Sequence, residues 1–347
     1  MIKVLIVDDS AFMRKLIEDI VNSSDKLKVV GKAKNGQEAL VQLEKLKPDV
    51  ITMDVEMPVM NGQVALEIIM KNNPIPVVML SAVTKKGADA TLMALEAGAV
   101  DFITKPESIF KVKDESVKND IIEKIIVASK VDIKKYKPIS TLGKNKIEKT
   151  KFLRSKKFSK IILIGTSTGG PRALQQVIPK IPGDINAPIL VVQHMPPGFT
   201  KSLSERLDNV SEVSVREAEG NEELLPGCVY IAPGDKHLKV KKVGGKFFTY
   251  LDDGELVSGH KPSVDALFNS VNQMNVSNVI AVIMTGMGKD GAKEIKKLKE
   301  NRNYTIAQDE ESCVVFGMPK SAIEINAITE VVGLCDIADS IVKAMEV

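Results

Sequence analysis

The sequence lacks the features that mark secreted, membrane-spanning or cysteine-rich metal proteins. Its only cysteines, Cys228, Cys313 and Cys335, lie far apart and form no C-x-x-C pair, which argues against disulfides and cysteine metal sites. No apolar run approaches the roughly 20 residues that span a bilayer, and the start "MIKVLIVDDS" has acids where a signal peptide has its apolar core. The net charge of +3 is too small to indicate nucleic acid. We therefore expect a cytoplasmic protein with reduced, mostly buried thiols.

What the sequence does contain is β-α alternation in two blocks. Residues 1–106 show five short β-rich runs separated by helical patterns, and an amphipathic stretch closes this block at about residue 129. Residues 130–158 are dense in lysine and predict a solvated linker, with a basic arm for an acidic partner as the alternative. Alternation resumes over residues 159–347, where "HLKVKKVGGKFFTYLDD" predicts a β-hairpin. Two α/β domains with doubly wound parallel sheets follow from this pattern.

Polar residues lie at the carboxyl ends of several predicted strands of the first block. Asp8 and Asp9 follow the first strand, Asp54 the third, Ser81 the fourth and Lys105 the fifth. The carboxyl ends of parallel strands meet at one edge of a sheet, so these side chains are expected to lie together. Three carboxylates in one place repel each other unless a divalent cation neutralises them, and oxygen-only ligands suit Mg²⁺. A carboxylate beside Mg²⁺ and a lysine is well placed to accept a phosphoryl group.

The first block resembles the receiver domain of two-component response regulators, which has a flavodoxin-like fold. The motifs that carry the resemblance are "VLIVDDS", "MDVEMPVMNG", "LSA" and "FITKP". The resemblance implies that Asp54 is the phosphoacceptor and that Asp8 and Asp9 hold the metal, assisted by the carbonyl of Glu56.

The same resemblance gives roles to three further residues of the first block. It implies that Ser81 and Lys105 contact the phosphoryl group. It also places Phe102 at the position of an aromatic switch residue.

The segment "IILIGTSTGG" of the second block, residues 161–170, allows two interpretations. A pyrophosphate-binding turn is one interpretation, but the G-x-G-x-x-G spacing is missing, and the strand "APILVVQ" ends at His194 instead of an acid. The other interpretation is a G-x-S-x-G turn that exposes Ser167 as a nucleophile. Ser167 and His194 follow two strands of this block, and Asp290 follows a third by a few residues. These three residue types together perform acyl transfer, with histidine as the base and the aspartate holding its tautomer.

The chain has two other histidines, and each is interpreted as an ordinary surface or loop residue. His237 lies at the entry to the predicted hairpin, and His260 precedes a predicted helix. His194 alone directly follows a predicted strand. The turns "TSTGG" and "TGMGKDG" supply small residues whose backbone N–H groups can form an oxyanion hole. A tight turn with a helix-capping hydroxyl is the plainer interpretation of "TSTGG".

The second block resembles the catalytic domain of chemotaxis-specific protein-glutamate methylesterases, the CheB family. The motifs include "IGTSTGGPRAL", "VVQHMPPGFTKSLSERL", "SGHKPSVDALF" and "MTGMGKDGA". The resemblance implies a Rossmann-like esterase domain with Ser167 as nucleophile, His194 as base and Asp290 as orienting acid. It also implies Thr168 as a nearby polar contact and the N–H of Met287 as an oxyanion donor.

The two resemblances together imply one regulated enzyme. It demethylates glutamate γ-methyl esters on chemoreceptors and deamidates receptor glutamines, needs no cofactor for the esterase reaction, and takes its phosphoryl group from the chemotaxis histidine kinase. Two alternatives remain open: a receiver-controlled binding module with an inactive hydrolase-like domain, and a receiver fused to a nucleotide-binding oxidoreductase.

Overall fold

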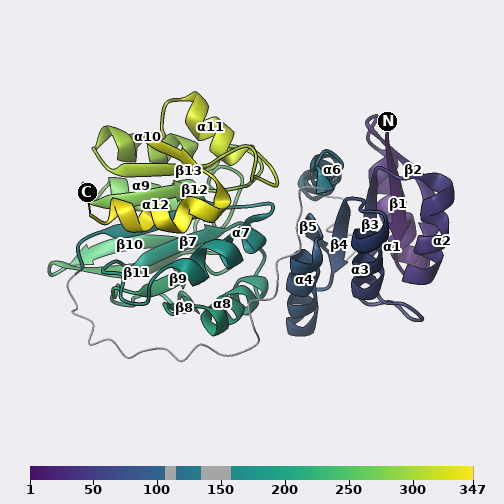
Figure 1. The fold of residues 1–347 in the computed structure, drawn as a ribbon, viewed down its shortest axis with the longest axis horizontal. Coiled ribbons are helices and arrows are strands. Elements are labelled where there is room, and N and C mark those ends of the chain that lie inside the picture. The colour runs from purple at the N-terminus through teal and green to yellow at the C-terminus, as the bar shows by residue number, and fades with distance from the viewer. Residues whose placement is uncertain (106–114, 134–157, 347) are drawn as a thin grey trace. The chain divides into compact units, whose positions relative to one another are not determined.

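A computed structural model of the chain describes residues 1–105, 115–133 and 158–346. The chain divides into two compact units, Met1–Thr141 and Leu142–Val347, and each has its own parallel β-sheet (Figure 1). The segment 130–158, which the sequence predicts to be a linker, lies mainly outside the described residues.

The first unit is a five-stranded parallel sheet with the strand order β2-β1-β3-β4-β5. Four of its helices begin at a polar side chain, Ser10, Asn35, Asn61 or Thr84, that accepts a hydrogen bond from the helix's first turn. Strands β3 and β4 are buried along their whole length, as strands between two helical layers are. The elements are β1 Ile2–Val7, α1 Ala11–Asn22, β2 Leu27–Ala33, α2 Gly36–Leu46, β3 Val50–Asp54, α3 Gly62–Asn72, β4 Val77–Ser81, α4 Lys85–Ala97, β5 Asp101–Thr104 and α6 Glu115–Ala128.

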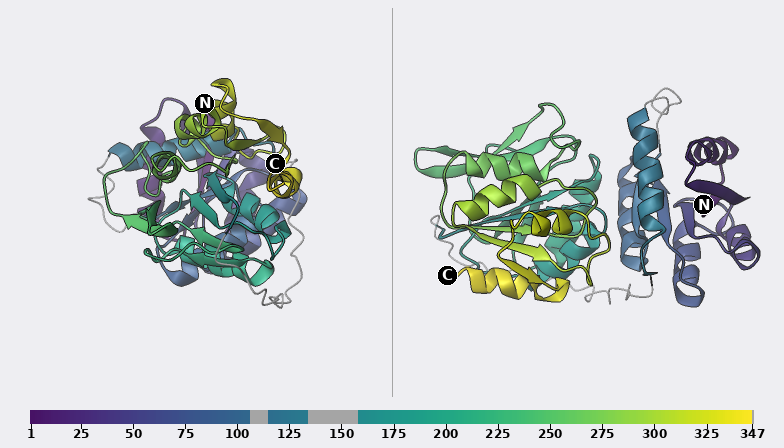
Figure 2. Two further views of the ribbon diagram at one scale, coloured as in Figure 1. Left: turned by 90° about the vertical axis from the view of Figure 1, so that its left-hand side faces the viewer. Right: turned by 90° about the horizontal axis from the view of Figure 1, so that it is seen from above.

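The second unit is a seven-stranded parallel sheet with the strand order β14-β13-β12-β6-β7-β9-β8. Helices α9, α10 and α11 pack with the hairpin on one face, while α7 and α12 lie on the other (Figure 2). The elements are β6 Ile161–Thr166, α7 Gly170–Val177, the 3-10 helix Ile178–Lys180, β7 Ile189–Gln193, α8 Phe199–Val210, β8 Ser214–Glu217, β9 Cys228–Ile231, β10 His237–Val243, β11 Lys246–Asp252, α9 Val264–Asn272, β12 Val279–Ile283, α10 Ala292–Glu300, β13 Tyr304–Gln308, α11 Met318–Glu324, β14 Glu330–Val332, the 3-10 helix Leu334–Asp336 and α12 Ile337–Ala344.

The predicted hairpin is present as the antiparallel pair β10–β11. Gly244 and Gly245 form its turn with φ values of 57° and 80°, a combination that a type I′ hairpin turn requires and that glycine adopts without strain. The pair forms a small sheet of its own, and its residues Leu238 and Val240 belong to the main core.

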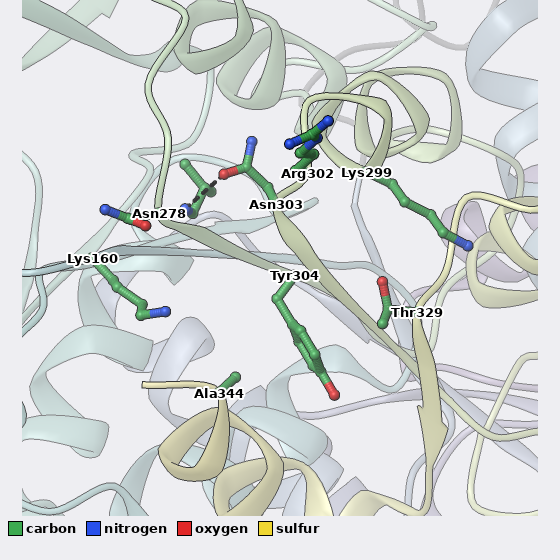
Figure 3. Close-up of a pocket in the computed structure, with 9 residues that line it drawn as sticks. Lys160, Asn278, Lys299, Arg302, Asn303, Tyr304, Thr329 and Ala344 are labelled. Carbon is green, nitrogen blue, oxygen red and sulfur yellow. Dashed lines mark hydrogen bonds between the residues drawn. The ribbon is translucent and has the colours of Figure 1, made fainter. Parts of the chain in front are cut away.

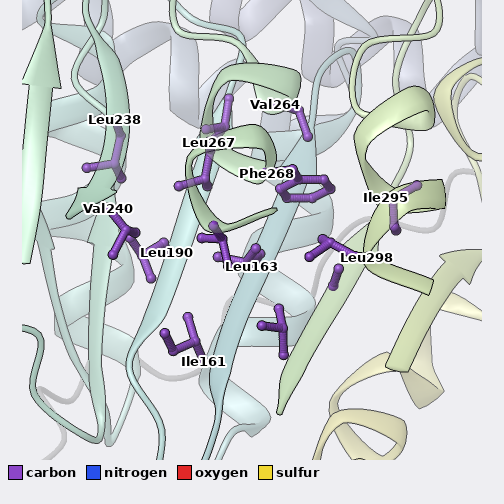
Figure 4. Close-up of a cluster of buried hydrophobic side chains, with 14 of the residues drawn as sticks. Ile161, Leu163, Leu190, Leu238, Val240, Val264, Leu267, Phe268, Ile295 and Leu298 are labelled. Atoms are coloured by element: carbon purple, nitrogen blue, oxygen red, sulfur yellow. The ribbon is translucent and has the colours of Figure 1, made fainter. Parts of the chain in front are cut away.

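Helix α9 is fixed against the centre of the sheet by a cluster of buried side chains (Figure 4). Leu267 and Phe268 belong to this cluster together with Leu163 of β6. At the start of the helix, a Cβ added to Gly165 would lie 2.4 Å from a methyl carbon of Val264. The first glycine of G-x-S-x-G therefore lets the N-terminus of α9 come close to the end of β6.

The predicted architecture of two doubly wound α/β units is confirmed. Strands β9, β13 and β14 are not among the predicted strands, because they are short or interrupted by polar residues. The expectation of mostly buried thiols is wrong in part, since only Cys228 is buried, while Cys313 is partly buried and Cys335 is exposed.

Candidate functional site

Ser167 and His194 occupy equivalent positions at the ends of two neighbouring strands. Thr166 of β6 pairs with Gln193 of β7, and the next residue on each strand is Ser167 or His194. The backbone N–H of His194 donates to the carbonyl of Thr166 at 3.1 Å. Adjacent strands lie about 4.8 Å apart, so the register itself brings these two residues together.

Asp290 reaches the same edge from the other side of β6. Strand β12 pairs with β6, with Ile283 opposite Gly165, and Asp290 lies in the turn that follows. This turn passes very close to the serine, because a Cβ on Gly286 would lie 2.7 Å from the Cβ of Ser167. The ends of β6, β7 and β12 therefore meet at one place on the edge of the sheet.

The carboxylate of Asp290 is buried and accepts four hydrogen bonds. His194 Nε2 at 2.8 Å and the N–H of Val264 at 2.7 Å bind Oδ2. The hydroxyl of Ser263 and the N–H of Asp265, each at 2.9 Å, bind Oδ1. Burial alone would raise the pKa of Asp290, but the hydrogen bond and charge of His194 and the two N–H donors outweigh it and lower the pKa. Asp290 is therefore held as an anion at the N-terminus of α9, where the helix dipole also favours negative charge.

His194 therefore has a defined tautomer. A carboxylate can only accept a hydrogen bond, so the proton of the neutral imidazole lies on Nε2 and Nδ1 keeps its lone pair. Nδ1 is buried and makes no hydrogen bond within the described residues. The structure thus provides an unpaired base atom beside a serine.

Hydrogen bonds of its backbone fix Ser167 at the same edge of the sheet. Its N–H donates to the carbonyl of Thr285 at 3.0 Å, and its carbonyl accepts from Gln193 Nε2 at 2.9 Å. Among the described residues no hydrogen bond joins the hydroxyl of Ser167 to Nδ1 of His194. Such bonds are often long in ligand-free enzymes and tighten when substrate is bound.

The two residues expected beside the triad lie in the same turns. Thr168 is buried, and its carbonyl accepts from the hydroxyl of Thr285 at 2.9 Å. Met287 follows Gly286, and within the described part of the chain its backbone N–H has no hydrogen-bond acceptor. That N–H is free to bind an oxygen atom of a substrate.

Two residues near this site were not predicted. Ser263 binds Asp290 directly, although in sequence it looks like an ordinary N-cap of α9, which it also is. The ring of His260 stacks on the ring of His194 with a centroid distance of 3.9 Å. The interpretation of His237 as a surface or loop residue is wrong, since it is 1% exposed in β10 and its Nε2 binds the carbonyl of Glu255.

The first unit brings its acidic residues and its lysine together as predicted. Lys105 Nζ lies 2.9 Å from Asp8 Oδ2 and 2.6 Å from Asp54 Oδ2. Burial alone would lower the pKa of Lys105, but hydrogen bonds and charges from the two aspartates raise it. Burial raises the pKa of Asp54, and this effect exceeds the opposing effect of Lys105. Lys105 thus supplies the positive charge that this carboxylate edge needs.

The same edge offers a donor set that fits Mg²⁺. Asp8, Asp9 and Asp54 each provide a carboxylate oxygen, and these atoms lie within 4.8 Å of one another. The side chain of Glu56 instead pairs with Lys86 at 2.7 Å. The predicted role of Glu56 therefore concerns its carbonyl alone.

Ser81 and Phe102 are buried and face other partners. The hydroxyl of Ser81 donates to the carbonyl of Gly87 at 3.2 Å and accepts from Thr91 at 2.7 Å, so it binds α4. The carbonyl of Phe102 accepts from Lys124 Nζ at 3.0 Å, and that amine lies 5.6 Å from the ring centroid. For Ser81 to contact a phosphoryl group on Asp54, its hydroxyl has to leave α4.

A cavity of 370 Å³ lies elsewhere in the second unit (Figure 3). Lys160, Asn278 and Asn303 line it, and each directly precedes a strand of the sheet. The cavity therefore opens at the amino ends of β6, β12 and β13, opposite the edge with Ser167. Its lining contains no serine, histidine or acid.

The two folds and their strand-end clusters define a response-regulator receiver domain joined to a second α/β domain that carries a hydrolase site. A family model described as a response regulator receiver domain matches residues 4–115, and one described as CheB methylesterase matches residues 162–341. The chain belongs to the CheB methylesterase family, and it is an enzyme that hydrolyses carboxylic esters.

Named relatives match the chain along almost its whole length. A protein-glutamate methylesterase/protein-glutamine glutaminase of Halalkalibacterium halodurans is 50% identical over 99% of this chain and 98% of its own. One from Bacillus subtilis is 46% identical over 100% of this chain and 99% of its own. The crystal structure of the Thermotoga maritima CheB methylesterase catalytic domain is 50% identical, with a TM-score of 0.52, and covers 54% of this chain and 98% of that one.

Within the part of the chain that the structure describes, none of the helices combines the length and the apolar character that crossing a bilayer requires.

Proposed function

We propose that this chain removes methyl groups from glutamate γ-methyl esters of chemotaxis receptors and deamidates receptor glutamines, through Ser167, His194 and Asp290. Support comes from the relatives, which are named protein-glutamate methylesterase/protein-glutamine glutaminase. The observation that carries the proposal is the buried His194–Asp290 hydrogen bond with an unpaired Nδ1 on the strand end next to Ser167.

In the first half of the reaction the Ser167 hydroxyl attacks the ester carbonyl. His194 Nδ1 takes the hydroxyl proton, and the resulting imidazolium is stabilised by the carboxylate of Asp290. The negative oxygen of the tetrahedral intermediate accepts a hydrogen bond from the N–H of Met287. The intermediate collapses when His194 returns the proton to the methoxy oxygen, so methanol leaves and an acyl-serine remains.

In the second half water replaces the alcohol. His194 Nδ1 takes a proton from water, the hydroxide attacks the acyl-serine carbonyl, and the proton passes to the oxygen of Ser167 as it departs. The products are a glutamate γ-carboxyl group and the free enzyme. A glutamine side chain follows the same steps with ammonia as the leaving group, so neither reaction needs a cofactor.

Asp54 is proposed as the phosphorylation site that regulates this reaction, with the chemotaxis histidine kinase as donor. Asp8, Asp9 and the carbonyl of Glu56 would hold Mg²⁺, which neutralises charge on the phosphoryl oxygens when it is bound. Lys105 would contact the phosphoryl group, and Ser81 would join it once its hydroxyl leaves α4. We place this activity in the cytoplasm, where thiols stay reduced, in keeping with the three free cysteines.

Methanol release from a methylated receptor peptide tests the esterase proposal. Wild-type protein should release one methanol per ester cleaved, and Ser167→Ala should release none above background. Unchanged release by Ser167→Ala would remove Ser167 from the mechanism.

The alternative is a phosphorylation-controlled binding module whose hydrolase domain is inactive. A serine-directed fluorophosphonate separates the two, because an activated serine forms a covalent adduct and an inactive one does not. Labelling of wild-type protein that is lost in Ser167→Ala supports the enzyme. Receptor binding without labelling or methanol release supports the binding module.

A further inference from the structure

The ring of His260 lies flat against the ring of His194. Their centroids are 3.9 Å apart and their planes differ by only 17°, so the contact is a face-to-face stack. The hydrogen-bonding atoms of an imidazole lie in the plane of its ring. Two stacked imidazoles therefore cannot exchange a proton directly, and His260 does not act as a second base for His194.

His260 is held by a tight turn. The N–H and carbonyl of Val257 bind the carbonyl and N–H of His260, at 3.1 and 3.0 Å. Ser258 and Gly259 lie between them with φ values of 53° and 81°, so the turn has the left-handed form of a two-residue hairpin. This closed turn fixes the Cα position from which the His260 ring projects.

The turn is tied to the same network that holds Asp290. The Ser258 hydroxyl donates to Asp265 Oδ2 at 2.7 Å, and the N–H of Asp265 donates to Asp290 Oδ1 at 2.9 Å. Asp290 in turn binds His194. The contacts thus form a closed circuit from His194 through Asp290, Asp265 and Ser258 to His260 and back to His194.

A second contact on His194 has a clear mechanical effect. The hydrogen bond from Nε2 to Asp290 fixes one atom of the ring, but the ring can still tilt about that bond. Such a tilt moves Nδ1, the atom on the opposite side of the ring, away from Ser167. A flat ring packed on the imidazole face opposes this motion, and small errors in the position of a catalytic group are costly to the rate.

We propose that His260 is a positioning residue, whose stacked ring sets the plane of His194 so that Nδ1 points at the Ser167 hydroxyl. This inference rests on the proposed serine esterase function and concerns the same site. It assigns the effect to the flat face of the ring, so a different aromatic ring should replace histidine, while an apolar side chain without a ring should not.

Three substitutions at His260 test this in the full-length protein: Phe keeps a flat ring, Leu keeps an apolar side chain without a ring, and Ala removes both. The assays are steady-state methanol release from a methylated receptor peptide and the rate of fluorophosphonate labelling of Ser167. His260→Ala and His260→Leu should lower kcat and the labelling rate about 10-fold or more, with KM within about twofold of wild type. His260→Phe should recover most of both rates.

Tyr250→Ala is the matched control. Tyr250 is an exposed ring on β11 of the hairpin, and its removal should leave both rates unchanged. Thermal unfolding of each variant shows whether the protein is folded. If His260→Ala does not fold, the comparison between His260→Leu and His260→Phe still tests the proposal.

Three results would overturn the proposal. Unchanged kcat in both His260→Leu and His260→Ala would show that the stack does not orient His194. Activity of His260→Phe as low as that of His260→Leu would show that the imidazole nitrogens matter instead of the ring face. A change confined to KM would make His260 a substrate contact. None of these depends on the assignment of Ser167, which fails separately if Ser167→Ala keeps its turnover and labelling.

Discussion

The carboxylate of Asp290 accepts a hydrogen bond from Nε2 of His194. The other ring nitrogen of His194, the buried Nδ1, is then the one that can accept a proton. The lowered pKa of Asp290 makes this pair a source of stability that depends on pH. An aspartate with a pKa depressed by folding contributes stability above its unfolded pKa of about 3.9, and this contribution is lost as pH falls through the folded pKa.

Asp290→Asn should therefore destabilise the catalytic domain most at neutral pH. The difference in free energy of unfolding between wild type and variant should shrink below about pH 4, because the carboxyl of the unfolded chain then takes up a proton while the folded carboxyl stays ionised until its lower pKa is reached. Denaturant unfolding from pH 7 to pH 3 measures it, with Asp253→Asn on the surface as control. A difference that grows with acid would contradict the sign of the pKa shift.

The choice of base predicts a ranking of the histidines. His194→Ala should lower kcat by about 10³-fold or more, because the triad acts as a unit. His237→Ala should cost much less, since the ring nitrogen Nε2 of His237 binds the carbonyl of Glu255 and not a member of the triad, and His260→Ala should fall between them. The assay is methanol release by variants whose thermal unfolding shows that they are folded. A loss in His237→Ala as large as that in His194→Ala would make the strand-end assignment wrong.

Gly286 is predicted to tolerate no side chain. A Cβ there would lie 2.7 Å from Ser167 Cβ and 2.4 Å from the sulfur of Met318. Gly286→Ala should cost about 1–3 kcal/mol of stability through overpacking and should lower kcat by displacing Ser167. Gly333→Ala is the control, because its nearest neighbour is 3.4 Å away and its φ of −65° suits alanine. Equal stability and kcat in the two variants would show that the turn adjusts freely.

The cluster around Lys105 predicts a single phosphorylation site. Acetyl phosphate and Mg²⁺ should add one acid-stable, base-labile phosphoryl group, and Asp54→Asn should abolish it. Intact-mass measurement before and after base treatment checks both statements. Full phosphorylation of Asp54→Asn at another residue would contradict the assignment of Asp54 as the phosphorylation site.

Regulation by the receiver predicts that the catalytic domain is more active by itself. A Lys-rich linker can join two domains without fixing them, so inhibition of one domain by the other would be reversible. A fragment of residues 157–347 should hydrolyse a small methylated peptide faster than the unphosphorylated full chain, and phosphorylation should move the full chain towards the fragment's rate. Such a peptide needs no receptor docking. Equal rates for all three forms would favour phosphorylation acting on docking alone.

The sequence was most informative where chemistry follows the end of a strand. Ser167 and His194 each come directly after a predicted strand, so the parallel topology alone predicts that they meet. Asp290 is harder to place, because it lies seven residues beyond the end of β12 and depends on how one glycine-rich turn folds. The predicted sheet was right for the same reason, since long apolar strands alternating with helices allow few other arrangements.

The contacts made by turns could not be predicted. His260 reaches His194 only because Ser258 and Gly259 adopt positive φ values, and no periodic pattern in the sequence reports that conformation. Ser81 is predicted to contact a phosphoryl group, and its hydroxyl here binds Gly87 and Thr91 of α4, contacts that no pattern in the sequence reports.

The paired ends of β6 and β7 have a consequence for how such a site changes over time. Ser167 and His194 are 27 residues apart in the chain, but each directly follows one member of the Thr166–Gln193 pair, so the lengths of the loops between β6 and β7 do not decide whether they meet. Insertions and deletions in those loops can reshape the surface without moving the two catalytic side chains. A shift of one residue in either strand would instead turn one of the two side chains to the opposite face. Loops can therefore diversify freely around this fixed pair, while the two strands cannot.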